Sequence, residues 1–288
     1  MRRSVSLSGL AMVAGFTLAA CRSDRPTPQV AESTTTSVTP HPDTVTITAT
    51  DYAFDGPAQV PAGATTMRLT NQGKQLHHAQ LIKLEEGKTV DDVLKLVKTP
   101  GPLPPWIKFV GGPNAIPPGQ QAVATAGLAP GKYAYVCVIP GADGVPHLAK
   151  GMIKGFEVTG PAGAAMELPA PDVTITLADY DFKTSGPLIP GVRTIRVENA
   201  GPQVHELQLL KLAPGKKVED FGRWAETGMK GAPPAEPVGG VVGLDKGGNG
   251  SFTANLTAGD YGLICFVPDA KDGKPHLAHG MMKTIKVG

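Results

Sequence analysis

The chain has 288 residues, and its 27 lysine and arginine residues nearly balance 25 aspartate and glutamate residues, giving a formal net charge of +2. This balance argues against nucleic acid or a strongly charged molecule as the main partner. The 36 glycines and 28 prolines indicate many turns between short elements.

Residues 1–20 have the pattern of an export signal. Two arginines precede an apolar run from Leu10 to Ala20, which is too short to be a membrane-spanning helix. The run ends in Leu-Ala-Ala-Cys, which resembles the bacterial lipoprotein box, in which the cysteine is acylated after cleavage. This resemblance predicts a lipid on Cys21 and an exported protein anchored to a membrane of the cell envelope, on its periplasmic or extracytoplasmic side. An ordinary cleaved signal with a chance cysteine is the alternative.

The remaining sequence divides into a tether and two domains. Residues 21–43 are rich in Ser, Thr and Pro and are expected to form a disordered tether. A small-residue and Pro-rich linker at 159–171 separates a first domain at 44–158 from a second at 172–288. Loss of residues 1–20 would remove two arginines and leave 25 groups of each sign, so the mature chain is formally neutral.

Strand signals dominate both domains. Val45, Ile47 and Ala49 alternate with threonines, as expected for a half-buried strand. In the first domain further strands are predicted at 66–70, 79–84, 121–126, 133–138 and 153–158. In the second domain strands are predicted at 173–177, 194–198, 207–212, 251–256, 261–266 and 283–287. This pattern favours an all-β fold of Greek-key sandwich or barrel type.

One short helix interrupts the strands of each domain. The segments 90–97 and 218–224 both have amphipathic spacing. Each is followed by a Pro-rich stretch that we interpret as a loop.

The two domains repeat the same residues at a fixed offset. Asn71 and His77 recur as Asn199 and His205, and Cys137 recurs as Cys265, all 128 positions later. A Pro-His-Leu-Ala motif followed by Gly-Met occurs with its histidine at 147 and again, 129 positions later, with its histidine at 276. A duplication that retains imidazole, thiol and thioether groups in each copy keeps the ligand types that suit copper.

The order of His, a Tyr-containing strand that ends in Cys, a second His and then Met resembles the type 1 copper site of the cupredoxins, the blue copper family. The long Cys-to-His segment resembles that of copper nitrite reductase. The resemblance implies two tandem cupredoxin-like domains, each with a copper ion that alternates between Cu(I) and Cu(II). It also implies the ligands of two sites. Site 1 would comprise His77, Cys137, His147 and Met152, and site 2 would comprise His205, Cys265, His276 and Met281.

Several residues have simpler interpretations. An exported protein could join Cys137 and Cys265 in a disulfide, but their equivalent places in two copies favour separate ligand roles. His78 faces Glu206 in the alignment of the copies, so we interpret it as a surface or rim residue. Each asparagine before a ligand histidine could support the ligand loop or only form a turn.

Other chemistry is not visible in the sequence. The neighbours of both copper cysteines are apolar, and the chain has no His-x-His motif. We therefore expect that the chain is not an enzyme. Three functions remain. They are electron transfer with a redox protein partner, copper buffering or delivery with a copper donor or acceptor, and a metal-free binding module.

Overall fold

The computed structural model describes residues 44–97, 101 and 103–288, which belong to one compact unit. The predicted export signal, the tether and Cys21 lie outside the described residues. Among the residues that the structure describes, no helix is long and apolar enough to cross a membrane.

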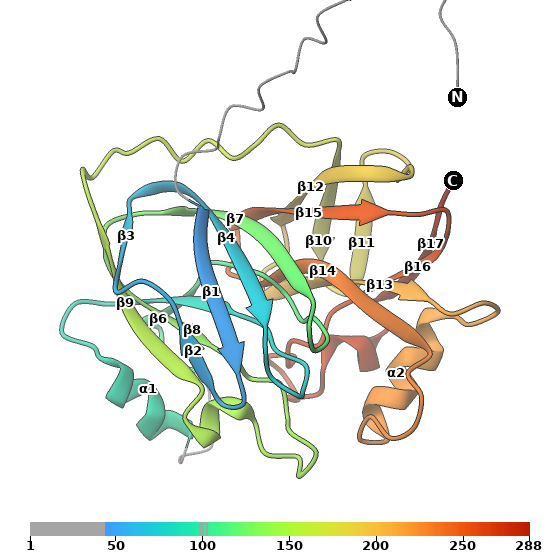
Figure 1. Ribbon diagram of the computed structural model, residues 1–288, viewed down its shortest axis with the longest axis horizontal. Helices are drawn as coiled ribbons and strands as arrows, with labels where there is room; N and C mark the ends of the chain where they lie inside the picture. Colours follow the sequence, from blue (N-terminus) through green and yellow to red (C-terminus); the bar gives the residue numbers. More distant parts are fainter. Residues whose placement is uncertain (1–43, 98–100, 102) are drawn as a thin grey trace, which may run out of the picture. The chain divides into compact units, whose positions relative to one another are not determined.

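The described chain is all-β, as predicted (Figure 1). The described residues within 44–159, here called repeat 1, form nine strands, and residues 172–288, here called repeat 2, form eight. The strands of repeat 1 are β1 (Thr44–Thr50), β2 (Ala53–Asp55), β3 (Gln59–Pro61), β4 (Gly63–Asn71), β5 (Gln80–Leu84), β6 (Ile107–Phe109), β7 (Gln121–Leu128), β8 (Gly131–Val136) and β9 (Ile153–Thr159). Those of repeat 2 are β10 (Val173–Ala178), β11 (Asp181–Thr184), β12 (Gly191–Asn199), β13 (His205–Leu212), β14 (Ala235–Leu244), β15 (Asn249–Leu256), β16 (Gly259–Ile264) and β17 (Met282–Val287).

Three sheets hold these strands. An eight-stranded sheet has the order β11-β10-β12-β15-β7-β4-β1-β2, so it runs continuously from repeat 2 into repeat 1. The junction is the antiparallel pair β15 and β7, in which Phe252 lies opposite Ala124. Repeat 1 adds a five-stranded sheet, β3-β9-β8-β5-β6, and repeat 2 adds a four-stranded sheet, β14-β13-β16-β17.

A separate apolar core fills each repeat. In β1 the residues Val45, Ile47 and Ala49 are buried while the intervening threonines are more exposed, which confirms the predicted alternation. They join the repeat 1 core, together with Leu69 of β4 and Tyr135 of β8. The equivalent core of repeat 2 is built around β10, β12, β13 and β16. Packing of both sheets onto one core fixes the strand ends that carry the candidate ligands.

Both predicted helices are present and cover the outer side of the smaller sheets. Helix α1 (Val90–Val97) contributes Val93 to a cluster with Ile82 and Ala134, which come from β5 and β8. Helix α2 (Val218–Glu226) contributes Phe221 to the matching cluster in repeat 2. Strands β8 and β16 are therefore buried on both faces, and this holds the cysteine that follows each strand in place.

The Pro-rich stretches that we interpreted as loops after these helices also contain strand. Strands β6 and β14 occupy part of those stretches. In β14, Pro237 and the pair Gly239-Gly240 break any alternation, so the sequence carries no strand signal there. Gly240 has φ +145°, and a Cβ at that position would lie 2.0 Å from the carbonyl oxygen of Leu207. Only glycine allows β14 to approach β13 this closely.

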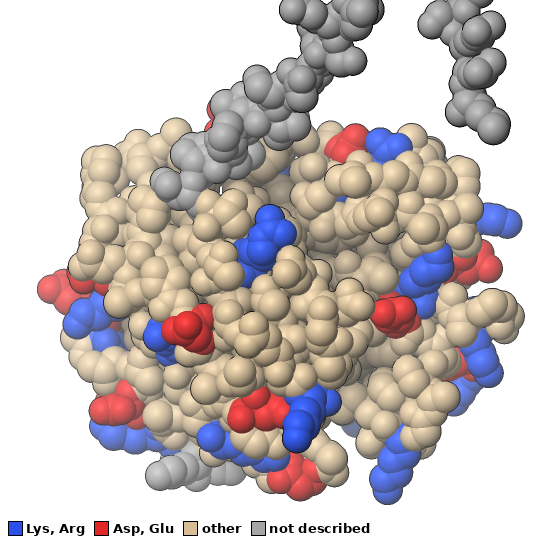
Figure 2. Space-filling model, viewed as in Figure 1, with Lys and Arg blue, Asp and Glu red and all other residues tan. Residues whose placement is uncertain are grey.

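Charged side chains of both signs are interspersed on the face drawn in Figure 2, and most of that face is uncharged. This distribution agrees with the near balance of charges in the sequence.

Candidate metal centres

The three strongest candidate ligands of site 1 converge in the core of repeat 1. His77 lies just before β5, Cys137 directly follows β8, and His147 begins a short 3₁₀ helix, η1 (His147–Lys150). The Cys137 Sγ lies 3.8 Å from the Nδ1 of His77 and 3.5 Å from the Nδ1 of His147. All three side chains are fully buried, and their potential ligand atoms form one group.

Site 2 has the same arrangement in the core of repeat 2. His205 is the first residue of β13, Cys265 follows β16, and His276 begins the 3₁₀ helix η2 (His276–His279). The two Nδ1 atoms lie 3.0 Å apart, and the Cys265 Sγ is 3.4 Å from the Nδ1 of His276. These three residues are also fully buried and form a second potential metal group.

Backbone hydrogen bonds fix the loop that carries three of the four candidate ligands of each site. In site 1 the amide of Cys137 donates to the carbonyl oxygen of Met152, and the amide of Met152 donates to that of His147. Gly151 adopts φ +96°, which ends η1 and returns the chain to β9. The same bonds join Cys265, Met281 and His276 in site 2.

The fourth candidate ligand of each site is a buried methionine. Met152 is fully buried in the same core cluster as Cys137. Met281 and Cys265 share the core of repeat 2 in the same way. A thioether in this place is a suitable weak axial ligand for copper.

The donor set fits copper. Bonds as long as those of zinc, about 2.0 Å to nitrogen and about 2.3 Å to sulfur, would place the donors around one metal ion of similar size roughly 3 to 4 Å apart. The separations of 3.8 and 3.5 Å in site 1 and of 3.0 and 3.4 Å in site 2 fall in this range. Two imidazoles with one thiolate and a nearby thioether form the donor set of blue copper centres.

The two site cysteines are free thiols, and each is buried in a different core. A disulfide between Cys137 and Cys265 is therefore absent from the described fold. Burial raises the pKa of the Cys137 thiol to about 12 and also raises the pKa of Cys265. Copper binding must therefore displace the thiol protons.

Burial also keeps the second histidine of each site neutral. It lowers the pKa of His147 to about 4, and the first histidine of that site, His77, lowers it further by repulsion. Burial and repulsion from His205 lower the pKa of His276 to about 4. Neutral imidazole is the form that binds a metal, so both rings are ready to coordinate near neutral pH.

Two carboxylates that the sequence analysis missed orient the first histidines. Asp51 Oδ1 lies 2.7 Å from the Nε2 of His77, and Asp179 Oδ1 lies 2.8 Å from the Nε2 of His205. A carboxylate that accepts a hydrogen bond from Nε2 keeps the ring proton on Nε2 and leaves Nδ1 free for the metal. The two aspartates are 128 positions apart, so the fixed offset was an available signal.

The asparagines before the first histidines form a turn and tie the segment before each first histidine to a neighbouring strand or loop. Asn71 accepts from the amide of Gly73, and its Nδ2 donates to the carbonyl oxygens of Gln75 and Ile116 at 2.8 and 3.0 Å. Asn199 makes the equivalent bonds in repeat 2. The turn is therefore confirmed, and none of these bonds reaches the loop that carries the cysteine, the second histidine and the methionine.

The interpretation of His78 as a surface residue is wrong. His78 is only 6% exposed, and its Nε2 accepts a hydrogen bond of 3.0 Å from the amide of Val138, next to Cys137. In repeat 2 the carboxylate of Glu206 accepts the matching bond from Phe266 at 2.9 Å. Two unlike residues therefore perform the same task, because each offers an acceptor to the amide after a ligand cysteine.

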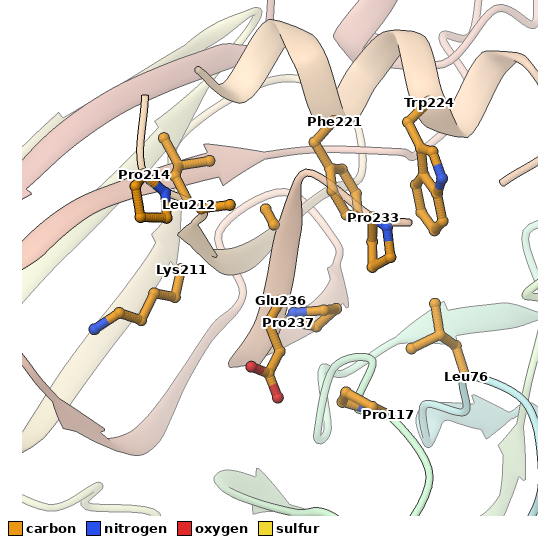
Figure 3. Close-up of a pocket in the computed structure, with 12 residues that line it drawn as sticks. Leu76, Pro117, Lys211, Leu212, Pro214, Phe221, Trp224, Pro233, Glu236 and Pro237 are labelled. Atoms are coloured by element: carbon orange, nitrogen blue, oxygen red, sulfur yellow. The ribbon is translucent and has the colours of Figure 1, made fainter. Parts of the chain in front are cut away.

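An apolar pocket of 610 Å³ lies between α2 and the loops of repeat 1 (Figure 3). Phe221 and Trp224 line it from α2, and Leu76 and Pro117 line it from repeat 1. None of the eight candidate ligands lines this pocket, so it is separate from both metal groups.

Each repeat is thus built on β-sheets around one core that holds a His, a Cys, a second His and a Met. This arrangement is cupredoxin-like.

No protein-family model and no curated protein sequence matches the chain. Among solved structures, auracyanin A, a "blue" copper protein from Chloroflexus aurantiacus, is 22% identical, with a TM-score of 0.30 over 40% of this chain and 98% of its own. A blue copper oxidase from Nitrosomonas europaea is 16% identical, with a TM-score of 0.23 over 84% of this chain and 85% of its own. A copper-containing nitrite reductase from Thermus scotoductus is 13% identical, with a TM-score of 0.23 over 85% of this chain and 61% of its own.

These matches correct one expectation. The oxidase and the nitrite reductase are enzymes by name, and each matches more than four fifths of the chain. This finding contradicts the expectation that the chain is not an enzyme, which depended on the missing His-x-His motif. With TM-scores of 0.23, the matches carry no reaction over to this chain.

Proposed function

We propose that this chain is a copper-binding electron-transfer protein with one type 1 copper ion in each repeat. The observation that carries the proposal is that two imidazoles and a buried free thiol form one group in each core, with donor-to-donor distances of 3.5 and 3.8 Å in site 1 and of 3.0 and 3.4 Å in site 2. The residues of this chain hold the donors in place through the ligand-loop hydrogen bonds and the two carboxylates. When bound, copper would supply a one-electron couple between Cu(I) and Cu(II).

Rigidity of the site supports electron transfer over copper delivery. The candidate ligands are 0% exposed and are held by backbone bonds on both sides of each loop. A fixed donor set that accepts both oxidation states keeps structural rearrangement small when an electron arrives. Exchange of copper with a delivery partner would instead require ligands that can reach the surface.

The test is copper loading of the purified protein. We expect about two copper ions per chain and an intense red-region absorption from the two thiolate ligands, bleached by a reductant and restored by an oxidant. Colourless binding, or fewer than one ion per chain, would exclude type 1 sites. Blue colour that is lost with copper during each reduction would favour delivery.

We further propose that the protein is exported and held at an envelope membrane by lipid on Cys21, where it exchanges electrons with a redox protein. The Leu-Ala-Ala-Cys sequence and the polar segment at 21–43 support this proposal. Cell fractionation tests it, because Cys21→Ala should release soluble protein or leave an uncleaved precursor. Wild-type protein found wholly in the soluble fraction would refute the anchor.

A further inference from the structure

The two candidate sites differ at the outer nitrogen of the second histidine. In site 1 the Nε2 of His147 lies 3.3 Å from the amide oxygen of Gln75. In site 2 the Nε2 of His276 is buried without a hydrogen-bond partner, and the nearest acidic group is the Asp269 carboxylate, whose Oδ2 lies 3.7 Å away. One imidazole therefore faces a neutral amide, whereas the other faces a carboxylate.

Asp269 is held firmly in this position. It is 3% exposed, and its Oδ2 accepts from the Tyr180 hydroxyl at 2.5 Å and from the Gln203 amide at 3.1 Å. The amide of Lys271 donates to Oδ1 at 2.8 Å. Three donors on one buried carboxyl group stabilise its charged form.

Repeat 1 has a lysine in place of this carboxylate. The residue 128 positions before Asp269 is Gly141, and a Cβ on Gly141 would lie 2.7 Å from the Nζ of Lys150. The Lys150 ammonium is 4.5 Å from the centroid of the Tyr52 ring, which in turn packs against His147 with ring centroids 4.9 Å apart. Asp143 pairs with the same ammonium at 2.8 Å, so the added positive charge is partly compensated.

One pair of carboxylate contacts is the same in both sites. Asp51 and Asp179 bind the first histidines at 2.7 and 2.8 Å, so the effects of these two contacts cancel in a comparison. Glu206 adds a further carboxyl group to site 2 alone, because it accepts from the amide after Cys265 where site 1 has His78. A buried carboxylate beside a ligand imidazole makes that ligand a stronger donor and favours the higher charge on the metal. A nearby ammonium favours the lower charge. Both differences therefore act in the same direction.

We propose that the two centres have unequal reduction potentials, with Asp269 lowering the potential of site 2 and Lys150 raising that of site 1. This inference rests on the proposed copper function. When the chain holds one electron for its two copper sites, that electron then resides at site 1. Oxidation of site 2 by one electron balances reduction of site 1 by one electron, and no proton is transferred.

Anaerobic redox titration of single-site variants tests the proposal. Cys137→Ser leaves only site 2 and Cys265→Ser leaves only site 1, so each absorption band reports one potential. We expect site 1 to be higher by at least 59 mV, the equivalent of a tenfold preference for a one-electron couple. In the site 2 protein, Asp269→Asn should raise the potential towards that of site 1. Asp272→Asn is the matched control, because Asp272 lies on the same rim but pairs with His279.

The outcomes separate the two proposals. Equal potentials in the two single-site proteins would overturn the inference, and so would equal shifts from Asp269→Asn and Asp272→Asn. Stepwise titration of the wild-type protein provides a second measurement that needs no variant at Asp269, and a single unsplit transition would also overturn the inference. Absence of the blue band from wild-type protein would instead refute the copper function itself.

Discussion

The Nε2 of His77 donates a hydrogen bond to the Asp51 carboxylate across 2.7 Å, and this contact aims the opposite nitrogen of the ring at Cys137. Burial of Asp51 opposes its ionisation, but the bond from His77 and the bonds from the backbone amides of Lys74 and Gln75 together outweigh burial and lower the pKa of Asp51. The histidine is 0% exposed, so no water competes for its outer nitrogen. The same contact between Asp179 and His205 orients site 2.

Removal of this carboxylate should weaken copper binding. We expect Asp51→Ala to lower the copper affinity of site 1 about 10- to 100-fold, because the ring loses the partner that fixes its tautomer and orientation. Competition with a chelator, monitored at the band of site 1 in the Cys265→Ser background, measures the change. Asp91→Ala on the exposed side of α1 is the control. Equal copper affinities of Asp51→Ala and Asp91→Ala would show that Asp51 does not support copper binding.

The single-cysteine variants should also show whether the sites are independent. A serine hydroxyl cannot replace a thiolate for a soft metal, so Cys137→Ser should abolish the absorption of site 1 and leave that of site 2. Cys265→Ser should do the reverse. Copper analysis and absorption spectra of both proteins, each expected to bind about one ion, measure this. Loss of both bands from either variant would show that the two sites form only together.

The sequence points to the candidate metal ligands because soft donors recur in register, whereas the groups that hydrogen-bond to them are ordinary polar residues. Asp51 and Gln75 also recur 128 positions later, as Asp179 and Gln203, but aspartate and glutamine near turns carry no metal signal by themselves. Asp269 could not be found by comparison of the repeats, because its counterpart is Gly141. Its role depends on a contact that only the folded loop creates.

Most strand positions could also be predicted, and the exceptions have local causes. Alternation identifies β1 and β10, but glycines that permit close backbone approach interrupt β14. The pairing of β7 with β15 across the two repeats has no sequence signature. An edge strand offers backbone N–H and C=O groups to any neighbouring strand, and the residue pattern does not specify which strand that is. Conversely, His78 carries a polar side chain that a single sequence assigns to the surface.

Acidification should destabilise the copper-free protein. The pKa of His78 falls to about 3 through burial, and burial lowers the pKa values of His147 and His276 to about 4. The unfolded chain, with histidine pKa values near 6.5, therefore binds more protons than the folded chain. By linkage, stability present above about pH 6.5 should be lost as the pH falls towards 4. Urea unfolding across this range measures the slope.

Replacement of His78 isolates one part of that slope. In His78→Gln a neutral oxygen can still accept the Val138 amide, but the proton-binding site is gone. The dependence of stability on pH should become shallower by up to about 1.4 kcal/mol per pH unit. Burial raises the pKa of Glu206 to about 7, so Glu206 makes the protein more stable as the pH falls from about 7 to 4.5. This contribution is present in both the wild-type protein and His78→Gln, so it cancels when their slopes are compared. His279→Gln, at an exposed ring, is the control. If neither variant changed the slope of stability against pH, buried His78 would not be a source of the pH dependence.

The contact between Asn114 and Glu206 should couple the two repeats. Asn114 is 2% exposed, and its Nδ2 donates across the boundary to the Glu206 carboxylate at 3.3 Å and to the carbonyl oxygen of Leu207 at 3.0 Å. Asn114→Ala leaves buried acceptors without a donor, at a cost of about 1–3 kcal/mol in the free energy of unfolding. Denaturant unfolding, with the exposed Asn249→Ala as control, measures this cost.

The same variant should also change the absorption of site 2. Since Glu206 adjoins His205 and accepts from the amide next to Cys265, the absorption band of site 2 should shift while that of site 1 is preserved. Equal stability of the two variants would show that this contact does not hold the repeats together.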